Sequence, residues 1–452
     1  MKAVAKDSIE RLYRIEIKPL FRYFKKEKLV FWFACLYLFF EYVRIQLMYP
    51  VIDVAPWTFL SILGMMLLAF KDPKIKWVSS TGNKMMIAMF VVIIVSSLLS
   101  KDVEYSFSHL DSFYNWMLIY FVLIAILNSE KRFFFFMLIY LIFNFKMSQH
   151  GFVSWMQRGF SFDADGVQGP PGWFSNSGEL GIQLCVYLPL SIYFIKPFYA
   201  NWNWIKKGIF LLMPFTAIGA AIASSSRGAL LGIAASGLVV LWKSPYKIKG
   251  TIFLVILSVA VYNAIPEESL KRFESSGTDS TSQQRLEIWK IGLNEMKDNP
   301  FFGVGFENWR PYYRQKYPQY NHYTAFVHNI FIQAGTELGY VGLSLFIVMV
   351  LYSFVANRQT RRFAKKTDNQ FFYNLAHGFD VSLVGMLVSA SFVTVLYYPY
   401  FWIHFTFVVA MNRIAMNQFR SYKKDKKKNK DNSEKKSKTD SSSASALLLV
   451  NK

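Results

Sequence analysis

Long apolar runs with almost no charge constrain this chain more than any other feature. GIFLLMPFTAIGAAIA occupies residues 208–223, and GALLGIAASGLVVLW follows at 228–242. Soluble helices and strands alternate apolar with polar residues, whereas runs of this length and composition suit the interior of a bilayer. Helices satisfy all their backbone hydrogen bonds internally, so they are the element that can cross lipid here. The sequence predicts an all-α, polytopic integral membrane protein.

The distribution of Lys and Arg predicts the orientation of these helices. Cytoplasmic loops carry the excess of basic residues, and the basic loops of this chain alternate along the sequence. Both termini are therefore expected in the cytoplasm, and the long loop 265–327 is expected to face outward. We expect about twelve spans, at 29–48, 54–70, 85–100, 113–127, 133–147, 178–198, 208–223, 228–242, 250–264, 329–355, 379–397 and 398–415.

The two ends of the chain are basic and poor in apolar residues. Residues 1–28 form a basic cytoplasmic segment, residues 29–415 the transmembrane domain, and residues 416–452 a basic tail whose composition predicts disorder. The formal net charge of +22 gathers on the predicted cytoplasmic face. We therefore expect anionic membrane lipids as partners, and no nucleic acid. Cys35 and Cys185 both fall in apolar spans, which favours small core side chains over a disulfide or a metal cluster.

One arginine stands in the seam between two apolar runs. SSSRGALLGI, residues 224–233, places Arg227 at the outward end of a span. Its guanidinium could simply reach the lipid headgroups. Alternatively, the small flanking residues allow an anion to approach, and the planar guanidinium matches phosphate oxygens in a bidentate way. Arg285 in the outward loop is either a solvated helix residue or a second cation, and a diphosphate carries enough charge to engage both.

The outward loop contains further patterned segments. SQQRLEIWKIGLNEMKDNP, 282–300, predicts an amphipathic helix that ends before Pro300 and carries its apolar residues on roughly one face. FGVGFENW, 302–309, lacks the glycine spacing of a nucleotide cradle and predicts a turn. The tyrosines of 312–326 suit either sugar stacking or an interfacial aromatic belt. The residues assigned to the apolar face of the helix are Leu286, Ile288, Trp289, Leu293 and Met296.

His328 opens the segment HNIFIQAGTELGYVGLSLF at the outward mouth of a span. An imidazole titrates near neutral pH and can accept a proton from a hydroxyl group, although a histidine bonded to the backbone is the structural alternative. Glu337 lies inside the membrane, where a structural hydrogen bond is the favoured interpretation. The glycines of this segment, Gly335, Gly339 and Gly342, predict close helix packing.

A metal site is not expected from these residues. FDADG, 162–166, has the D-x-D spacing that holds a metal in many nucleotide-sugar transferases. That loop is expected to face outward, however, whereas nucleotide sugars are cytoplasmic.

Four segments, in this order, resemble the O-antigen ligase superfamily, which also contains Wzy-type polymerases and ligases that glycosylate proteins. The segments are SSSRGA, QQRLEIWK, FFGVGFENW and VHNIFIQAGTELGYVGLSLF, and the resemblance covers about 170–350. VQGPPGWFSNSGELGIQLCVYLPL is further similar to O-glycosylation ligases associated with exosortase systems.

The resemblance implies transfer of a glycan from undecaprenyl diphosphate to an acceptor hydroxyl of a lipid A core, another glycan or a protein. It implies a bacterial inner-membrane enzyme with a periplasmic active site, without metal or cofactor. Arg227 and Arg285 match the arginines assigned to the diphosphate, and His328 matches the histidine assigned to the acceptor; attack from the opposite face would invert the anomeric centre. These three are the candidate catalytic residues. The candidate substrate-binding residues are Arg227, Arg285, Asn329, Trp289, Arg310 and Arg314.

Two alternatives stay open. A Wzy-type polymerase differs from a ligase only in its acceptor, and the GPPG segment favours the ligase. A transporter or lipid flippase of twelve spans is the alternative from another class. Transporters place their charges and broken helices near the middle of the bilayer, whereas the cations here cluster at the outer mouth.

Overall fold

The computed structural model describes residues 9–73, 75, 77, 79–161, 166–244, 246–252, 255–256, 280–320 and 325–450. Within these ranges every regular element is a helix, which confirms the all-α prediction. Seven helical stretches are long and apolar enough to cross a membrane, so the polytopic prediction is also confirmed. They are Leu29–Met48 (α3, η1 and α4), Thr81–Leu98 (α6), Val103–Ile126 (α7 and α8), Ser177–Ile195 (α10), Trp204–Ala223 (α11), Ile330–Thr367 (α17) and Gln370–Ala390 (α18).

The predicted total of twelve spans remains a prediction. α5 (Trp57–Lys71) is a shorter apolar helix, and most of the span expected at 250–264 lies outside the described residues. The remaining helices are α2 (Ile17–Lys26), α9 (Glu130–Gln157), η2 (Tyr199–Asn201), α12 (Arg227–Lys243), α15 (Ser280–Asp298), α16 (Trp309–Lys316), η3 (Pro318–Tyr320) and α19 (Pro399–Val450).

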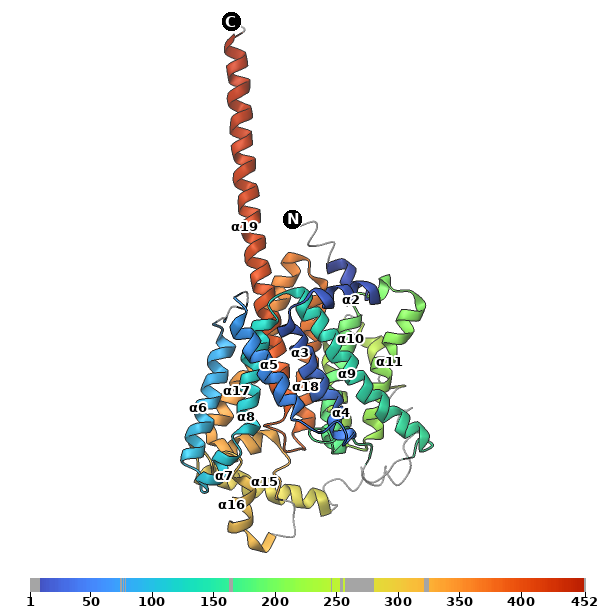
Figure 1. Ribbon diagram of the computed structural model, residues 1–452, viewed down its shortest axis with the longest axis vertical. Helices are drawn as coiled ribbons and strands as arrows, with labels where there is room; N and C mark the ends of the chain where they lie inside the picture. Colours follow the sequence, from blue (N-terminus) through green and yellow to red (C-terminus); the bar gives the residue numbers. More distant parts are fainter. Residues whose placement is uncertain are drawn as a thin grey trace.

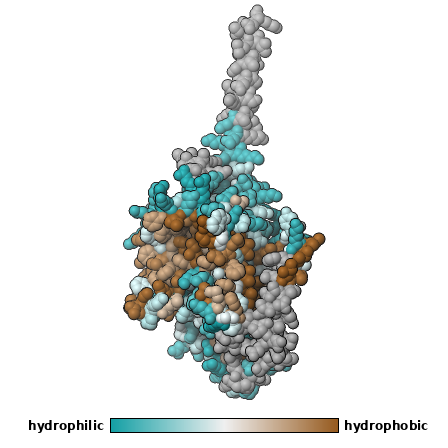
Figure 2. All heavy atoms as spheres, turned by 90° about the vertical axis from the view of Figure 1, so that its right-hand side faces the viewer, coloured by the Kyte–Doolittle hydropathy of each residue, from teal (hydrophilic) through white to brown (hydrophobic). Residues whose placement is uncertain are grey.

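The two ends of the helix bundle carry different parts of the chain (Figure 1). α2 and the projecting part of α19 lie at one end, which we call the terminal end. α7, α15 and α16 lie at the opposite end, which we call the loop end. Figure 2 shows an apolar band across the middle of one face of the bundle, with hydrophilic residues toward the terminal end. This arrangement is consistent with termini on one side of a membrane and the loop helices on the other.

α18 lies at the centre of the bundle. It packs against α10, α12 and α17, and α17 in turn packs against α19. Cys35 and Cys185 are both buried, as expected for small core side chains. Because α18 contacts three of the helices that lead to the loop end, its C-terminal turn is the natural place for their ends to meet.

α17 is broken at Gly339, which corrects the prediction that this glycine serves close helix packing. Gly339 has φ 66° and ψ −171°, a conformation that side chains disfavour. The exposed backbone groups of the break bond to residues 300–305: Val304 N donates to Thr336 O at 2.8 Å, and Tyr340 N donates to Pro300 O at 2.7 Å. The turn predicted for FGVGFENW is confirmed, and its role is to complete the hydrogen bonds of a membrane helix.

Two other glycines and Glu337 have distinct roles around this break. Gly335 does serve close packing, because a Cβ there would lie 2.3 Å from Met296 Cε of α15. Gly342 instead faces Leu338 of its own helix across the break. Glu337 is buried and accepts from Gln333 Nε2 at 3.4 Å, as the structural interpretation predicts.

The last two helices depart from the predicted boundaries. α18 ends at Ala390 rather than at residue 397, so the apolar segment 391–398 is a turn and not part of a span. α19 begins at Pro399 and continues to Val450 through the tail for which composition predicts disorder. Lysine and glutamate have high helix propensities, so a composition that excludes a packed core does not exclude a helix.

Candidate active site

The serine-rich turn places Arg227 at the first position of α12. α11 ends at Ala223, and Ser225 has φ 52° in the turn that follows. Ser226 caps α12, because its Oγ accepts from Ala229 N at 3.3 Å. Arg227 is half-buried. The N-terminus of a helix carries a partial positive charge, so the guanidinium and the helix end favour an anion together.

The loop that precedes α10 is rich in glycine and proline, and it packs against this turn. Val167 N donates to Ala223 O at 2.9 Å, and a Cβ on Gly166 would lie only 2.0 Å from Ser224 O. Arg44 anchors the other end of the loop: its Nη1 donates to Pro171 O at 2.9 Å, and its guanidinium lies 5.6 Å from the Trp173 ring centroid. Arg44 falls within the predicted span 29–48, and its role in the loop is not evident from the sequence because Pro171 and Trp173 lie more than 120 residues away.

His328 is held by its backbone just before α17. Its N donates to Thr394 Oγ1 at 2.7 Å, and its φ of 49° is unusual for a residue other than glycine. Left-handed backbone of this kind costs about 1–3 kcal/mol and is enriched at functional sites. Asn329 caps α17, with its Oδ1 accepting from the N atoms of Phe331 and Ile332. Asn329 therefore fixes the start of the helix beside His328.

Arg285 lies close enough to His328 to influence its titration. Burial and the Arg285 guanidinium together lower the pKa of His328 to about 4. α15 is docked beside His328 by Trp289, whose Nε1 donates to Val327 O at 2.8 Å. Both Arg285 and Trp289 thus belong to the surroundings of His328, and at neutral pH the imidazole is neutral.

The turn 391–398 connects the two halves of the site. A Cβ on Gly228 would lie 3.3 Å from Phe392 Cβ, so the start of α12 rests on this turn. The Phe392 and Trp289 ring centroids are 6.4 Å apart. Thr394 accepts the His328 N–H. The elements that carry Arg227, Arg285 and His328 therefore converge on one turn, whose part in the site is not evident from the sequence because its residues resemble a membrane span.

The remaining candidate residues lie on or near α16. The Arg310 guanidinium lies 4.4 Å from the Phe326 ring centroid, and the Phe326 and His328 ring centroids are 5.9 Å apart. Arg310 therefore borders the site. Arg314 is exposed in the last turn of α16, and the contacts of the described residues do not connect it to His328.

Three of the loop tyrosines have structural roles that neither sequence interpretation anticipates. The buried carboxylate of Glu295 on α15 accepts from Tyr312 Oη at 2.6 Å and from Lys316 Nζ at 2.5 Å, and also from Tyr317 Oη. Burial opposes ionisation of Glu295, but the hydrogen bonds from Lys316 and the two tyrosines prevail and lower its pKa. Tyr313 is buried in a small core between α15 and α16. These contacts fix α16 against α15.

The amphipathic helix predicted in the loop is confirmed as α15, but its buried face differs from the prediction. Ile288, Ile291 and Met296 are buried, whereas Leu286 and Leu293 are exposed. The reason is that Gly292 and Met296 approach Ile332 and Gly335 of α17, which orients the Ile288 side inward. Residues 162–165 of FDADG lie outside the described residues.

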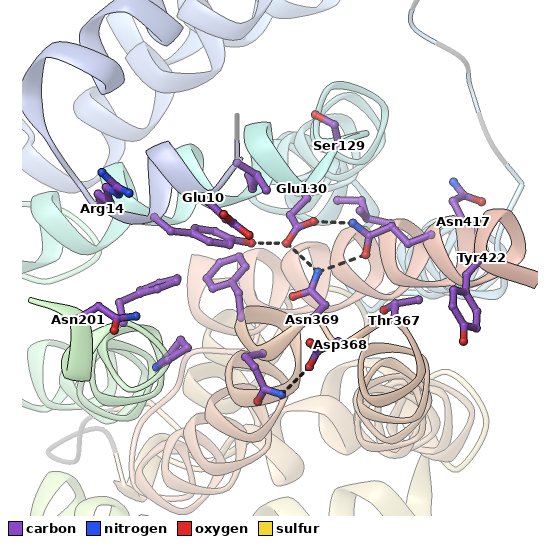
Figure 3. A pocket seen from close by; sticks show the side chains of 18 of the residues that line it. Glu10, Arg14, Ser129, Glu130, Asn201, Thr367, Asp368, Asn369, Asn417 and Tyr422 are labelled. Carbon is purple, nitrogen blue, oxygen red and sulfur yellow. Dashed lines mark hydrogen bonds between the residues drawn. The ribbon is translucent and has the colours of Figure 1, made fainter. Parts of the chain in front are cut away.

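A hollow of considerable size lies at the opposite, terminal end (Figure 3). Its volume is about 1420 Å³, and Glu130 lies in it with both carboxylate oxygens engaged. Asn369 Nδ2 donates to Oε1 at 2.7 Å and Gln418 Nε2 donates to Oε2 at 2.6 Å, while Tyr13 also donates to Oε1. The hollow does not contain any candidate site residue.

Comparison with known proteins matches one segment of the chain. Residues 209–347 match the family model described as O-Antigen ligase. This segment contains Arg227, Arg285 and His328. It begins after residues 167–190, so the similarity of those residues to exosortase-associated ligases stays a prediction. No curated protein matches the chain.

Proposed function

We propose that the protein moves a glycan from a polyprenyl diphosphate to an acceptor hydroxyl, because residues 209–347 match the O-antigen ligase family model. The match supports, at the level of the superfamily, glycan transfer by a multi-pass bacterial membrane protein. The observation that carries the finer proposal is that the elements bearing Arg227, Arg285 and His328 converge on the turn 391–398, through Gly228, Trp289 and the His328 backbone.

Arg227 and Arg285 would hold the diphosphate. Each guanidinium can give two parallel hydrogen bonds to phosphate oxygens, and charge-assisted bonds of this kind are about twice as strong as neutral ones. The negative charge on the diphosphate grows as the bond from the anomeric carbon to the phosphate oxygen breaks. Donors fixed in advance around that oxygen stabilise the transition state more than the ground state.

His328 would orient the acceptor hydroxyl and take its proton. The new bond joins the acceptor oxygen to the anomeric carbon, the electron pair of the broken bond leaves with the diphosphate, and the hydroxyl proton passes to the imidazole. Attack from the face opposite the diphosphate inverts the anomeric centre. A neutral imidazole is required at the start, and the lowered pKa of His328 provides it.

Donor binding would strengthen His328 as a base. Arg285 lowers the pKa of His328 in the structure, after the larger effect of burial. A diphosphate bound to Arg285 would offset that positive charge and raise the pKa of His328 toward the range in which a general base is effective. His328 would then be a weak base in the free protein and a stronger one once the donor is bound.

Purified protein with a defined polyprenyl-diphosphate glycan and candidate acceptors tests the proposal. We expect release of polyprenyl diphosphate together with a glycosylated acceptor of inverted configuration. Movement of the intact donor across liposomes without any change in its linkage would instead support the transporter or flippase alternative.

Ligase and polymerase are separated by the glycans of a deletion strain. Loss of a ligase leaves long chains on the carrier lipid, whereas loss of a polymerase leaves single repeats. We propose the ligase and expect the long chains. Lipid A core, a glycan and a protein are the acceptor classes to compare.

A further inference from the structure

Two leucines of α15 are exposed beside the candidate site and take little part in packing the helix. Leu286 and Leu293 are 49% and 48% exposed. A different face of the helix packs on α17, where a Cβ on Gly292 would lie 2.8 Å from Ile332 Cγ2. Half-exposed leucines that lie together on one flank of a helix offer apolar surface for contact with another molecule.

The leucines lie on the same side of the helix as Arg285. At about 100° per residue, Trp289 is rotated by about 40° from Arg285, Leu293 by about 80° and Leu286 by about 100°. The Trp289 ring continues the apolar surface inward to Phe392, with ring centroids 6.4 Å apart. Arg285, Trp289, Leu286 and Leu293 therefore form one strip, cationic at its inner edge and apolar beyond it; we call it the α15 strip.

The outer boundary of the α15 strip is polar. Lys290 and Lys297 are exposed and lie about 140° and about 120° from Arg285. Leu286 and Leu293 are separated by about 10 Å along the helix axis. α15 itself lies crosswise at the loop end, beneath the ends of the bundle helices (Figure 1). An apolar strip of this length between cations suits a hydrocarbon chain that is attached to a phosphate group.

We infer that the α15 strip binds the isoprenoid chain of the donor next to its diphosphate, with Leu286 and Leu293 setting the preference for a long hydrocarbon chain. The inference rests on the proposed function, because the diphosphate must be at Arg285 for the chain to start there. In this proposal α15 has two roles: it carries Arg285, and it binds the lipid part of the donor.

Donors that differ only in chain length test this inference. The full-length protein in nanodiscs is assayed with one glycan diphosphate on a long polyprenyl chain and on a chain of two isoprene units. For Leu286→Ser/Leu293→Ser we expect the KM of the long donor to rise about tenfold and that of the short donor to stay within about twofold, because only the long chain reaches both leucines. Asn294→Ser/Asp298→Ser, at exposed positions outside the strip on the same helix, is the matched control and should leave both KM values within about twofold.

A loss that is equal for both donors, or no change with either, would overturn the inference. If the double variant fails to fold, the test is a photo-crosslinking residue introduced at position 293, compared with one at 294. Crosslinks from 293 to the long donor support the inference, whereas crosslinks from 293 to bulk phospholipid alone overturn it and indicate a membrane anchor. Failure of the proposed function differs from both outcomes, because the unaltered protein would then transfer glycan from neither donor.

Discussion

Glu130 at the terminal end and the Arg227, Arg285 and His328 group at the loop end are surrounded in contrasting ways. Three side chains donate to the Glu130 carboxylate, and the hollow around it is lined by more acidic than basic residues. At the loop end, the elements that carry two arginines and a histidine with a lowered pKa converge on one turn. The comparison teaches that a hollow alone is a poor guide here, because the charge of Glu130 at the terminal end is already satisfied by protein groups.

Replacing His328 should give the largest effect on transfer. We expect His328→Ala to lower kcat/KM by about 100- to 10,000-fold, because it removes the group that orients the acceptor and takes its proton. The measurement is initial rates of transfer with purified protein at matched levels. Thr394→Val removes the acceptor of the His328 N–H and should cause a smaller loss. Near-normal transfer by His328→Ala would show that His328 is not the catalytic base, and the contrast between the two ends would then be wrong.

Replacing Arg227 or Arg285 should give the second-largest effect on transfer. Arg227→Ala and Arg285→Ala should each lower kcat by about 100- to 1,000-fold, because each removes a donor to the charge that develops on the diphosphate. Arg227→Lys should recover only part of the loss, since lysine lacks the bidentate geometry. Arg314→Ala is the control, because this exposed arginine is not connected to His328. Full activity of Arg227→Lys would show that charge alone suffices.

The pH dependence of kcat and kcat/KM tests whether Arg285 and bound diphosphate influence the pKa of His328. Protonation of His328 removes the base, so kcat/KM should fall as the pH drops through about 4, the pKa that burial and Arg285 give it in the free protein. The fall in kcat should occur at a higher pH, because bound diphosphate offsets Arg285. In Arg285→Gln the fall in kcat/KM should also move to higher pH. Identical pH profiles for kcat and kcat/KM would contradict the coupling between donor and histidine.

Glu130 should give the smallest effect on transfer. In Glu130→Gln the new amide nitrogen faces Gln418 Nε2, which loses its acceptor at 2.6 Å. We expect the free energy of unfolding to fall by about 1–3 kcal/mol while kcat/KM stays within about twofold. Thermal unfolding and transfer assays on the same preparation measure both. If Glu130→Gln abolished transfer without lowering stability, the terminal end would have a role in transfer, contrary to this comparison.

Local signals in the sequence predict part of this structure. α10 and α12 begin within one residue of the predicted spans, because serine and asparagine caps immediately precede long apolar runs. Ser226, the cap of α12, places Arg227 at a helix start, and Asn329, the cap of α17, places His328 just before one. The break at Gly339 and the turn 391–398 are different. A glycine three residues from another fits close packing or a break equally well, and only the backbone of residues 300–305 decides between them.

The role of Arg44 depends on the tertiary structure in the same way. Nothing near it in sequence reveals that Pro171 O will be its acceptor. The buried face of α15 also follows from contacts with α17 rather than from its own pattern, in which two apolar faces compete. Local patterns thus predict where helices start and which side chains stand there, whereas the partners of those side chains come from the packing of distant segments.

The interrupted backbone of α17 limits how this molecule can admit its substrates. Residues 300–305 and the interrupted stretch 336–341 share hydrogen bonds, and Ser96 Oγ donates both to Phe302 O and to Glu337 O. Swinging that segment away like a lid would strand several peptide groups in an apolar setting, at a cost of several kcal/mol. We therefore expect residues 300–305 to keep their place against α17 while donor and acceptor enter.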